Sequence, residues 1–370
     1  RDIRIGENSL AFAPGGGTVF ASNLKIGRRS GTLEDFHNLL KLVQMSNVLH
    51  FTGEQLVAPQ DVPVPVRHLR RALAIFTLSD KAAMGATHGR LVSTDVLAMA
   101  RLVFGPAFEK DVVVGGVINI NSPLRFDSGM LGGLMTYARA GQAVIITPFI
   151  LAGAMSPITL AAALAQQNAE TLAGVALAQL VRPGAPVIYG GFTTNVDVKS
   201  GSPAFGTPEG AWALLVGAQL ARRYGLPYRG SGSLNTSKAV DAQAISETLW
   251  TLWPAVMGHT NFVLHSVGWL EGGLTVSYEK FIIDQESLAM FAHFLQSIQL
   301  DSPANGYQPV LAEQQNFRAG MKGGATDITT RAFHKWQFML AAYEPPPIEP
   351  DVAGALNRYV TRREESVNRP

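Results

Sequence analysis

The run HSVGWLEGG places an imidazole, an indole and a carboxylate at alternating positions, as His265, Trp269 and Glu271. If the segment is extended, side chains two residues apart share a face, so these three groups converge. Imidazole and carboxylate groups are frequent carriers of general acid–base catalysis. His265 and Glu271 are therefore candidate catalytic residues. The structural alternative is that His265 hydrogen-bonds within the core, Trp269 packs there, and Glu271 caps the next loop.

Two further polar pairs follow apolar runs. Asn119 and Asn121 share a face by the same period of two, and asparagine is depleted in strands. They indicate either ligand binding or turn formation, since Asn-Ser-Pro also favours chain reversal. Asn195 and Asp197 lie in the segment TTNVDVKSG. Asp197 could hold a positively charged substrate, or it could organise its own loop.

Lys81 follows another apolar run and could form a Schiff base if its pKa were lowered. No metal site is predicted, because the eight histidines are scattered and the closest pair, His259 and His265, lacks helical i, i+4 spacing. The chain has no cysteine, which excludes disulfides, thiolate zinc sites and a cysteine nucleophile.

Composition narrows the class of protein. The 370 residues are 47% hydrophobic and 16% charged, with a net charge of only +2 and no basic stripe with interleaved aromatics, so nucleic acid is not an expected partner. The longest nearly apolar run, 143–155, is shorter than the about 20 residues of a membrane span, so we expect a core element and no membrane association. No signal-peptide pattern follows Arg1, and we expect a cytoplasmic protein.

Short β-branched runs alternate with longer helical stretches. Strands are expected at 48–52, 74–79, 112–119, 143–149, 185–192, 228–232, 261–269 and 280–284. Helices are expected at 32–46, 156–181, 207–224, 241–257 and 285–300. The strand runs are nearly continuous in apolar character, which is typical of parallel strands covered on both faces.

About eight such repeats predict an α/β fold, a TIM-type (β/α)8 barrel with an N-terminal embellishment and a C-terminal peripheral helix. We expect the embellishment and first helix at 1–47, the barrel at 48–342, and a proline-rich connector with the last helix at 343–370. No Gly-x-Gly-x-x-Gly turn supports a dinucleotide fold. In a barrel, reactive groups lie at the carboxyl ends of strands, where the candidates above are expected.

Several segments resemble the trimethylamine methyltransferase family. They are NSPLRFD, PITLAAALAQQNAETLAG, QLVRPGAPVIYGG, QLARRYGLPYR and GWLEGGLTVSYEKFIID, which occur in this order. The resemblance as a whole extends over about two thirds of the chain. The resemblance implies a barrel that binds a methylated amine and passes its methyl group to the Co(I) of a small corrinoid partner protein. It implies no tightly bound cofactor or metal in the chain itself, and it allows a homo-oligomer.

The resemblance also points to a substrate class. The chain contains only the standard twenty amino acids, so the pyrrolysine of the archaeal trimethylamine enzymes is absent. A quaternary ammonium such as a betaine already carries a neutral leaving group, and it is bound by aromatic faces and carboxylates. Trp269 and Glu271 fit those roles. Further walls could come from Phe149, Tyr189 and Phe192, and His265 and Asn121 could bind a substrate carboxylate or meet the corrinoid.

Two other functions stay open. One is a lyase or aldolase barrel using Lys81 or Glu271, and the other is a non-catalytic binder of betaine-like solutes. The run NGYQPVLAEQQNF at 305–317 departs from the histidine-containing segment expected at this point in the family. If that segment shapes the pocket, the choice of substrate differs in this chain.

Overall fold

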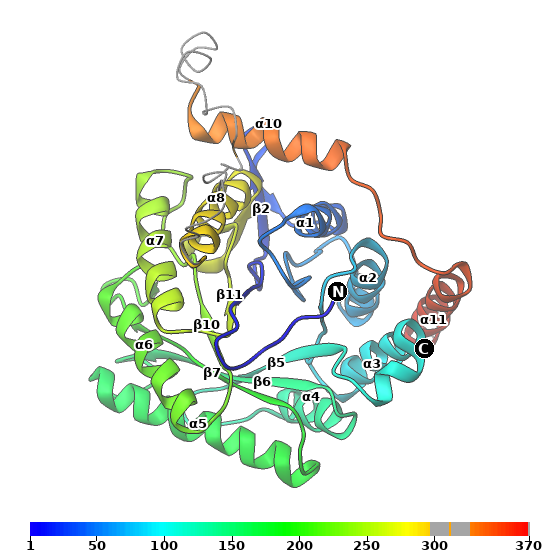
Figure 1. The fold of residues 1–370 in the computed structure, drawn as a ribbon, viewed down its shortest axis with the longest axis horizontal. Helices are drawn as coiled ribbons and strands as arrows, with labels where there is room; N and C mark the ends of the chain where they lie inside the picture. The colour runs from blue at the N-terminus through cyan, green and yellow to red at the C-terminus, as the bar shows by residue number, and fades with distance from the viewer. Residues whose placement is uncertain (297–310, 312–325, 369–370) are drawn as a thin grey trace, which may run out of the picture.

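The computed structural model describes residues 1–296, 311 and 326–368. Its centre is a parallel sheet that curls around the molecular axis (Figure 1). Neighbouring strands in it are, in order, β1 (Ala11–Phe12), β11 (Phe262–Leu264), β10 (Tyr228–Ser231), β7 (Val187–Gly190), β6 (Ala143–Ala152), β5 (Val114–Ile120) and β4 (Ala83–Met84). β8 (Phe192–Val196) extends the sheet along the end of β6, and β9 (Pro203–Ala204) pairs antiparallel with β8. The predicted parallel α/β arrangement is confirmed.

A short extended segment that contains His50 and Phe51 contacts both edges of this sheet. Phe51 forms a parallel bridge with Ala82, next to β4. On its other side, the His50 amide donates to the Phe12 carbonyl of β1 over 2.8 Å. The interior of the curled sheet is filled by apolar side chains, namely Ala11, Phe51, Met84, Ile145, Ile188, Phe262 and Leu264. Two of these side chains, Met84 and Leu264, also line a cavity at the carboxyl ends of the strands.

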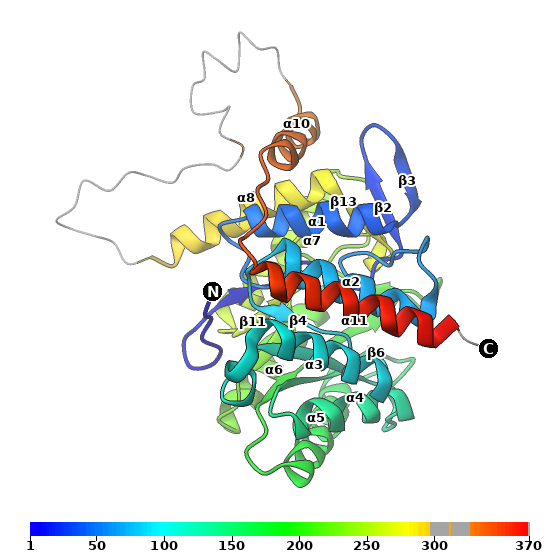
Figure 2. The same ribbon diagram turned by 90° about the vertical axis from the view of Figure 1, so that its right-hand side faces the viewer.

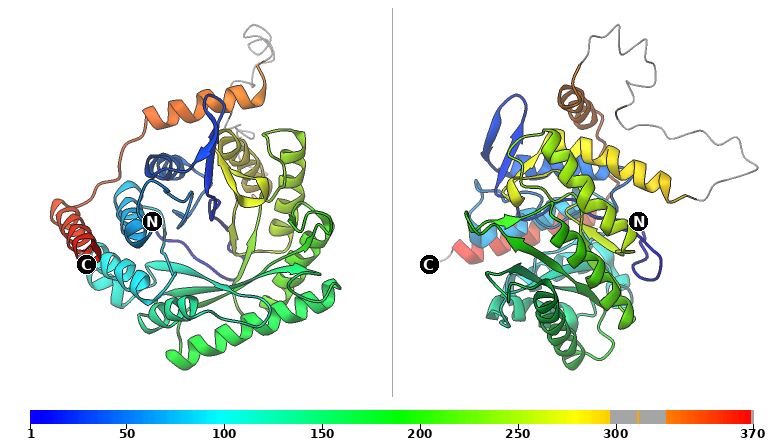
Figure 3. Two further views of the ribbon diagram at one scale, coloured as in Figure 1. Left: turned by 180° about the vertical axis from the view of Figure 1, so that it is seen from behind. Right: turned by 90° about the vertical axis from the view of Figure 1, so that its left-hand side faces the viewer.

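The helices α1 to α8 surround the strands (Figures 1 and 3). They are α1 (Leu33–Met45), α2 (Val64–Leu78), α3 (Arg90–Phe104), α4 (Ser128–Arg139), α5 (Leu160–Val181), α6 (Pro208–Arg223), α7 (Ala242–Met257) and α8 (Tyr278–Phe294). Several begin at side-chain caps, which satisfy amides that a helix start leaves unpaired. Thr32 forms a capping box with Asp35, and Asp127 and Asp241 cap α4 and α7.

A second, smaller sheet covers one end of the strands. β12 (Trp269–Leu270) pairs with β13 (Thr275–Ser277), and β13 pairs with the hairpin of β2 (Phe20–Asn23) and β3 (Gly27–Ser30) (Figure 2). Short 3-10 turns η1 (Gly105–Glu109) and η2 (Glu271–Gly273) follow α3 and β12. At the carboxyl end, α10 (Ile328–Ala341) packs on α8 and α1, and α11 (Pro350–Asn368) packs on α2 and α3.

Two expected strands are helical. Residues 74–79 lie at the end of α2, and residues 280–284 lie in the first turns of α8. Short apolar runs do not distinguish a strand from a buried helical turn, because both are apolar on several sides. In α8 the Ser277 hydroxyl accepts from the Lys280 amide, and this cap starts the helix before the apolar run begins.

Residues 90–109, which form α3 and η1, have the length and apolar composition of a helix that could cross a membrane, the one such stretch among the described residues. In this fold α3 packs against α2, α4 and α11. Helices in the core of proteins outside membranes meet the same criterion, so composition alone does not decide the environment of α3.

A buried carboxylate ties α11 to the helices around the sheet. Asp95 on α3 is 2% exposed. It contacts His68 Nε2 at 3.0 Å and accepts hydrogen bonds from Tyr359 and Arg363 of α11, both over 2.7 Å. Burial raises the pKa of the Asp95 carboxyl, but the hydrogen bonds from His68, Arg363 and Tyr359 outweigh burial and hold that pKa well below its usual value.

The Asp95→Asn variant is expected to lose about 2 kcal/mol or more of stability at pH 7. Because the folded pKa is lowered, this stabilisation is present above the unfolded pKa of about 4 and is lost as the pH falls below it. Urea unfolding at pH 7 and pH 3.5 measures the difference, which should shrink at the lower pH. Substitution of the exposed Asp111 is the control. A wild-type-minus-variant difference that stays constant with pH would contradict the assignment.

Candidate active site

A cavity of about 630 Å³ lies at the carboxyl ends of the parallel strands, where a barrel fold places its reactive groups. Six residues singled out from the sequence line it, namely Asn119, Asn121, Phe149, Phe192, His265 and Trp269. The period-of-two reasoning correctly placed both asparagines on the inner face of β5 and its extension. Among the described residues, no three histidine, aspartate or glutamate side chains gather as a metal site requires.

One wall of the cavity is aromatic. Phe192 lies at the centre, with its ring centroid 5.0 Å from Phe149, 5.6 Å from Phe205 and 6.2 Å from Trp269. The strands bring these rings together, because Phe149 of β6 is the register partner of Phe192 of β8. Gly273 leaves room for the indole, since a Cβ there would lie 2.3 Å from Trp269 Cζ2. Together the faces form a surface suited to a cation without hydrogen-bond donors.

His265 stands beside this wall as a buried, neutral group. Its ring stacks on Trp269 with centroids 4.5 Å apart, and its Nδ1 lies 3.0 Å from the Ser231 hydroxyl. Burial, followed by the positive charge of Arg229, lowers the pKa of His265 well below its usual value. A neutral imidazole carries one donor and one acceptor, so His265 can hydrogen-bond a ligand but is not a cation at neutral pH.

Arg229 of β10 was not identified from the sequence. Its side chain is 2% exposed and lines the cavity, yet its Nε atom has no hydrogen-bond partner among the described residues. Nη1 donates to the Gly191 carbonyl over 3.2 Å, and the guanidinium carbon lies 5.3 Å from the Phe192 ring centroid. Burial lowers the pKa of Arg229 to about 10, so the side chain stays charged at neutral pH.

This guanidinium lacks a counterion among the residues that the structure describes. Within the described residues no carboxylate oxygen lies within 4.0 Å of Arg229. Arginine is rarely buried without a partner, because the charge loses its hydration. The two carboxylates in the cavity lining are engaged elsewhere: Glu54 pairs with Arg71, and Asp127 caps α4. The cavity therefore offers a buried positive charge to an anion.

Glu271 lies just outside the cavity lining. Its carboxylate accepts from Arg28 Nε at 2.9 Å and from the Thr275 hydroxyl at 3.1 Å. Its neighbours Gly272 and Gly273 line the cavity instead. Of the three side chains that were predicted to converge, His265 and Trp269 line the cavity, and Glu271 does not. The reason is local backbone geometry, because β11 ends at Leu264 and His265 has a positive φ of 58°.

Three other predicted residues also lie away from the cavity lining. Asp197 organises its own exposed loop by accepting from the Lys199 amide and the Ser200 hydroxyl. The Asn195 side chain accepts from the Thr207 hydroxyl over 2.9 Å. Tyr189 is fully buried, and its hydroxyl donates to Asn168 of α5 on the helix side of the sheet.

Lys81 was expected at the end of a strand but precedes β4, at the amino edge of the sheet opposite the cavity. Its ammonium donates to the carbonyls of Ser46 and Leu49. Burial lowers the pKa of Lys81 to about 7, and the side chain does not line the cavity. The segment 305–317, which was expected to affect the pocket, lies outside the described residues except for Leu311.

A family model and the similar proteins of known sequence all point to methyltransferases of one family. The family model for trimethylamine methyltransferase (MTTB) matches residues 1–306 and 303–368. A glycine betaine methyltransferase of Desulfitobacterium hafniense (strain Y51) is 37% identical over 395 residues, which cover 99% of this chain and 82% of that protein. A trimethylamine methyltransferase of Methanosarcina barkeri is 30% identical over 275 residues, covering 66% of this chain and 54% of that protein.

A solved structure shares the fold. The crystal structure of the hydroxylamine MtmB complex has a TM-score of 0.51 and 9% sequence identity, and the match covers 93% of this chain and 75% of that chain. At this identity the likeness concerns the fold alone. The match of the family model to nearly the whole chain, together with the 37% identical relative, shows that the chain belongs to the trimethylamine methyltransferase family.

Proposed function

We propose that this protein transfers a methyl group from a carboxylate-bearing quaternary amine to the Co(I) of a corrinoid held by a partner protein. The observation that carries the proposal is one cavity that joins an aromatic wall to a buried guanidinium whose Nε has no partner and which has no counterion among the described residues. A betaine has the matching charges, with a donor-free cation at one end and a carboxylate at the other. The name of the 37% identical relative, a glycine betaine methyltransferase, supports the same substrate class.

The two ends of the substrate have separate binding groups. Phe149, Phe192, Phe205 and Trp269 present ring faces to the trimethylammonium group through cation–π attraction. Arg229 offers its charge and its unpaired Nε–H group to the carboxylate, and a guanidinium is a group that can pair with a carboxylate through two parallel hydrogen bonds. The neutral His265 and the amides of Asn119 and Asn121 lie in the same lining and can complete the hydrogen bonds.

The chemistry needs no protein nucleophile. The carbon–nitrogen bond breaks with its electron pair remaining on nitrogen, which leaves as a neutral tertiary amine. The methyl acceptor, a Co(I) corrinoid, is a co-substrate whose electron pair forms the new bond to carbon. The chain's own residues hold the methyl group in line and exclude water, and such positioning can supply most of the acceleration. A neutral tertiary amine would first need protonation, so quaternary amines are the favoured substrates.

The rim of the cavity supports docking of the corrinoid protein. Leu124, Ile158 and Val198 are 73%, 77% and 87% exposed, and they lie in the loops that follow the neighbouring strands β5, β6 and β8. Exposed apolar side chains on one edge are typical of a protein contact surface. A corrinoid presented at this edge meets the open end of the cavity.

Val198→Glu is expected to slow methyl transfer to a small corrinoid protein about tenfold, because it places a charge in the docking contact. Transfer to free cobalamin should stay at the wild-type rate, since Val198 does not line the cavity. The rates are compared with a corrinoid protein that supports turnover by the wild type. Val112→Glu is a matched control, because Val112 is exposed at the opposite edge of the sheet. Equal rates for wild type and V198E with both acceptors would remove Val198 from the docking surface.

We also infer that the sheet closes into the (β/α)8 barrel expected from the sequence. The contacts of His50 with β1 and of Phe51 with the start of β4 support this closure, because they join the two edges through one segment. The ring then includes β1, which falls in the segment 1–47 that we treat as an N-terminal embellishment of a barrel at 48–342.

The alternatives make different demands on the cavity. A Schiff-base lyase would need its lysine in the cavity, and the position of Lys81 at the opposite edge argues against that role. A non-catalytic binder would use the same rings and the same Arg229. The test is absorbance of Co(I)-cobalamin mixed with the protein and a panel of quaternary and tertiary amines. Methyl-cobalamin should form with a carboxylated quaternary amine and not with trimethylamine. Binding of the betaine without methyl-cobalamin formation would favour the binder.

A further inference from the structure

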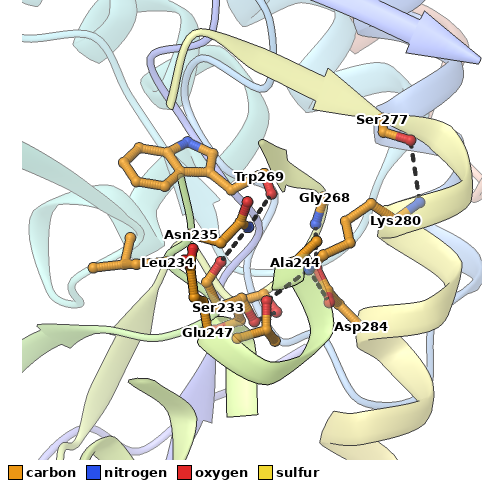
Figure 4. Close-up of polar contacts among 12 residues, drawn as sticks. Ser233, Leu234, Asn235, Ala244, Glu247, Gly268, Trp269, Ser277, Lys280 and Asp284 are labelled. Carbon is orange, nitrogen blue, oxygen red and sulfur yellow. Dashed lines mark hydrogen bonds and ion pairs between the residues drawn. The ribbon is translucent and has the colours of Figure 1, made fainter. Parts of the chain in front are cut away.

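A buried ion pair lies behind the aromatic wall. Lys280 and Asp284, one helical turn apart on α8, are both 0% exposed, and the Lys280 ammonium donates to Asp284 Oδ1. The second carboxylate oxygen, Oδ2, accepts the Gly268 amide over 2.8 Å (Figure 4). The ammonium also donates to the Thr248 hydroxyl of α7 over 2.7 Å. The pair thus joins α7, α8 and the segment that leads into β12.

Gly268 is held from both sides by α8 and its cap. Asp284 accepts its N–H, and its carbonyl accepts from the Ser277 amide over 2.9 Å. Gly268 has a positive φ of 83°, and this turn directs the next residue, Trp269, into the cavity. A Cβ at Gly268 would lie 3.0 Å from Val276, so the turn fits closely against β13.

Two loops hold Trp269, one through its backbone carbonyl and one through its indole N–H group. Its carbonyl accepts from Asn235 Nδ2 over 2.6 Å, as Figure 4 shows, and its indole N–H donates to the Gly16 carbonyl over 3.2 Å. The indole in turn stacks on His265 and contacts Phe205. A small shift of the Gly268 backbone would therefore move the Trp269 indole and disturb its contacts with His265 and Phe205.

The energetics of a buried ion pair favour a positional role. Removing two charges from water is costly, and well-packed apolar residues often replace such a pair without loss of stability. What apolar residues cannot replace is the directed acceptor for the Gly268 amide. We propose that Asp284, neutralised and oriented by Lys280, is a positioning residue that fixes Gly268 and Trp269 and thereby sets the cation-binding wall. The proposal rests on the proposed function, in which that wall binds the trimethylammonium group.

Two double variants separate the hydrogen bond from the charge. Lys280→Met with Asp284→Asn removes both charges and keeps an amide oxygen that can accept from Gly268. Lys280→Met with Asp284→Leu removes the acceptor as well. The readout is the ratio of two dissociation constants measured by calorimetry. One ligand is a trimethylammonium carboxylate, and the other is a carboxylate of the same shape in which an uncharged tert-butyl group replaces the trimethylammonium group. This ratio reports cation recognition and does not depend on methyl transfer.

The wild type is expected to prefer the cation about thirtyfold, the Leu double variant about threefold, and the Asn double variant to recover most of the preference. A merely structural role would lower the melting temperature of both variants and leave the ratio unchanged. If the Leu double variant does not fold, Asn235→Leu, which releases the Trp269 carbonyl without touching a charge, must reduce the ratio in the same way. Asp95→Asn, which disturbs a buried charge network away from the cavity, should lower stability and keep the ratio.

The outcomes distinguish the two proposals. A wild type that binds neither compound, or binds both equally, would contradict the proposed function. A wild type that prefers the cation, with Leu and Asn double variants of equal preference, would overturn the positioning role of Asp284 alone.

Discussion

Replacing Arg229 with methionine is expected to raise the KM for a carboxylated quaternary amine about a hundredfold, because truncating one member of a buried, hydrogen-bonded charge pair costs about 2–5 kcal/mol in binding. Folding should be retained, since among the described residues the guanidinium has one hydrogen-bond partner, the Gly191 carbonyl, and no counterion. Methionine removes a buried charge and keeps an unbranched side chain that can fill the space. Steady-state kinetics with free Co(I)-cobalamin measure the effect.

The main control compares the effect of R229M on substrates with and without a carboxylate. A quaternary amine with a hydroxyl in place of the carboxylate should be used by the R229M variant and the wild type with KM values within about threefold, because it offers Arg229 no anion. Arg101→Met is a matched variant, since Arg101 also lies over a phenylalanine ring, Phe108, but far along α3 from the cavity. Equal losses for both substrates would mean that Arg229 supports the cavity without binding the carboxylate.

Phe192→Leu is expected to weaken binding of the quaternary amine about thirtyfold, which corresponds to the about 2 kcal/mol of a desolvated cation–π contact. Phe192 contacts Phe149, Phe205 and Trp269, so its ring is the centre of the wall. Leucine keeps most of the apolar contact and removes the ring face. Calorimetric titration of the amine without cobalamin measures the loss directly.

The neutral tert-butyl isostere separates cation–π attraction from packing in this experiment. Its affinity should change less than about threefold in the F192L variant, because it keeps the carboxylate but its tert-butyl group carries no positive charge for the ring to attract. Phe76→Leu provides a control for ring removal in general, since Phe76 packs on Phe104 among the outer helices. Parallel losses for the cation and the neutral isostere would show that Phe192 acts through shape only.

The positions of several parallel strands along the chain were predictable because strands covered on both faces have nearly continuous apolar sequences. β5, β6, β7 and β10 lie where such runs predicted them. The two expected strands that are helical, at 74–79 and 280–284, are turns buried on several sides, for which local composition carries the same signal as a strand. Only the cap at Ser277, three residues upstream of Lys280, indicated a helix there.

The candidate site was predictable to the extent that the chain stays extended. Asn119 and Asn121 line the cavity because β5 keeps its period of two up to Ile120. Beyond Leu264 the period fails, since His265 and Gly268 both have positive φ, and Glu271 is turned toward Arg28. Arg229 was missed because a lone charge in a short strand is usually a solvated residue, and only the fold shows that it is buried.

The most direct test of methyl transfer is a single turnover with a betaine whose N-methyl carbons are labelled with carbon-13, mixed with the protein and one equivalent of Co(I)-cobalamin. Carbon-13 NMR then follows the label. Labelled methyl-cobalamin and the demethylated tertiary amine are expected in equal amounts, and the reaction should be lost in the R229M variant at subsaturating betaine. Label that stays entirely on the betaine, while calorimetry shows that the betaine is bound and the cobalt is confirmed as Co(I), would contradict the proposed methyl transfer.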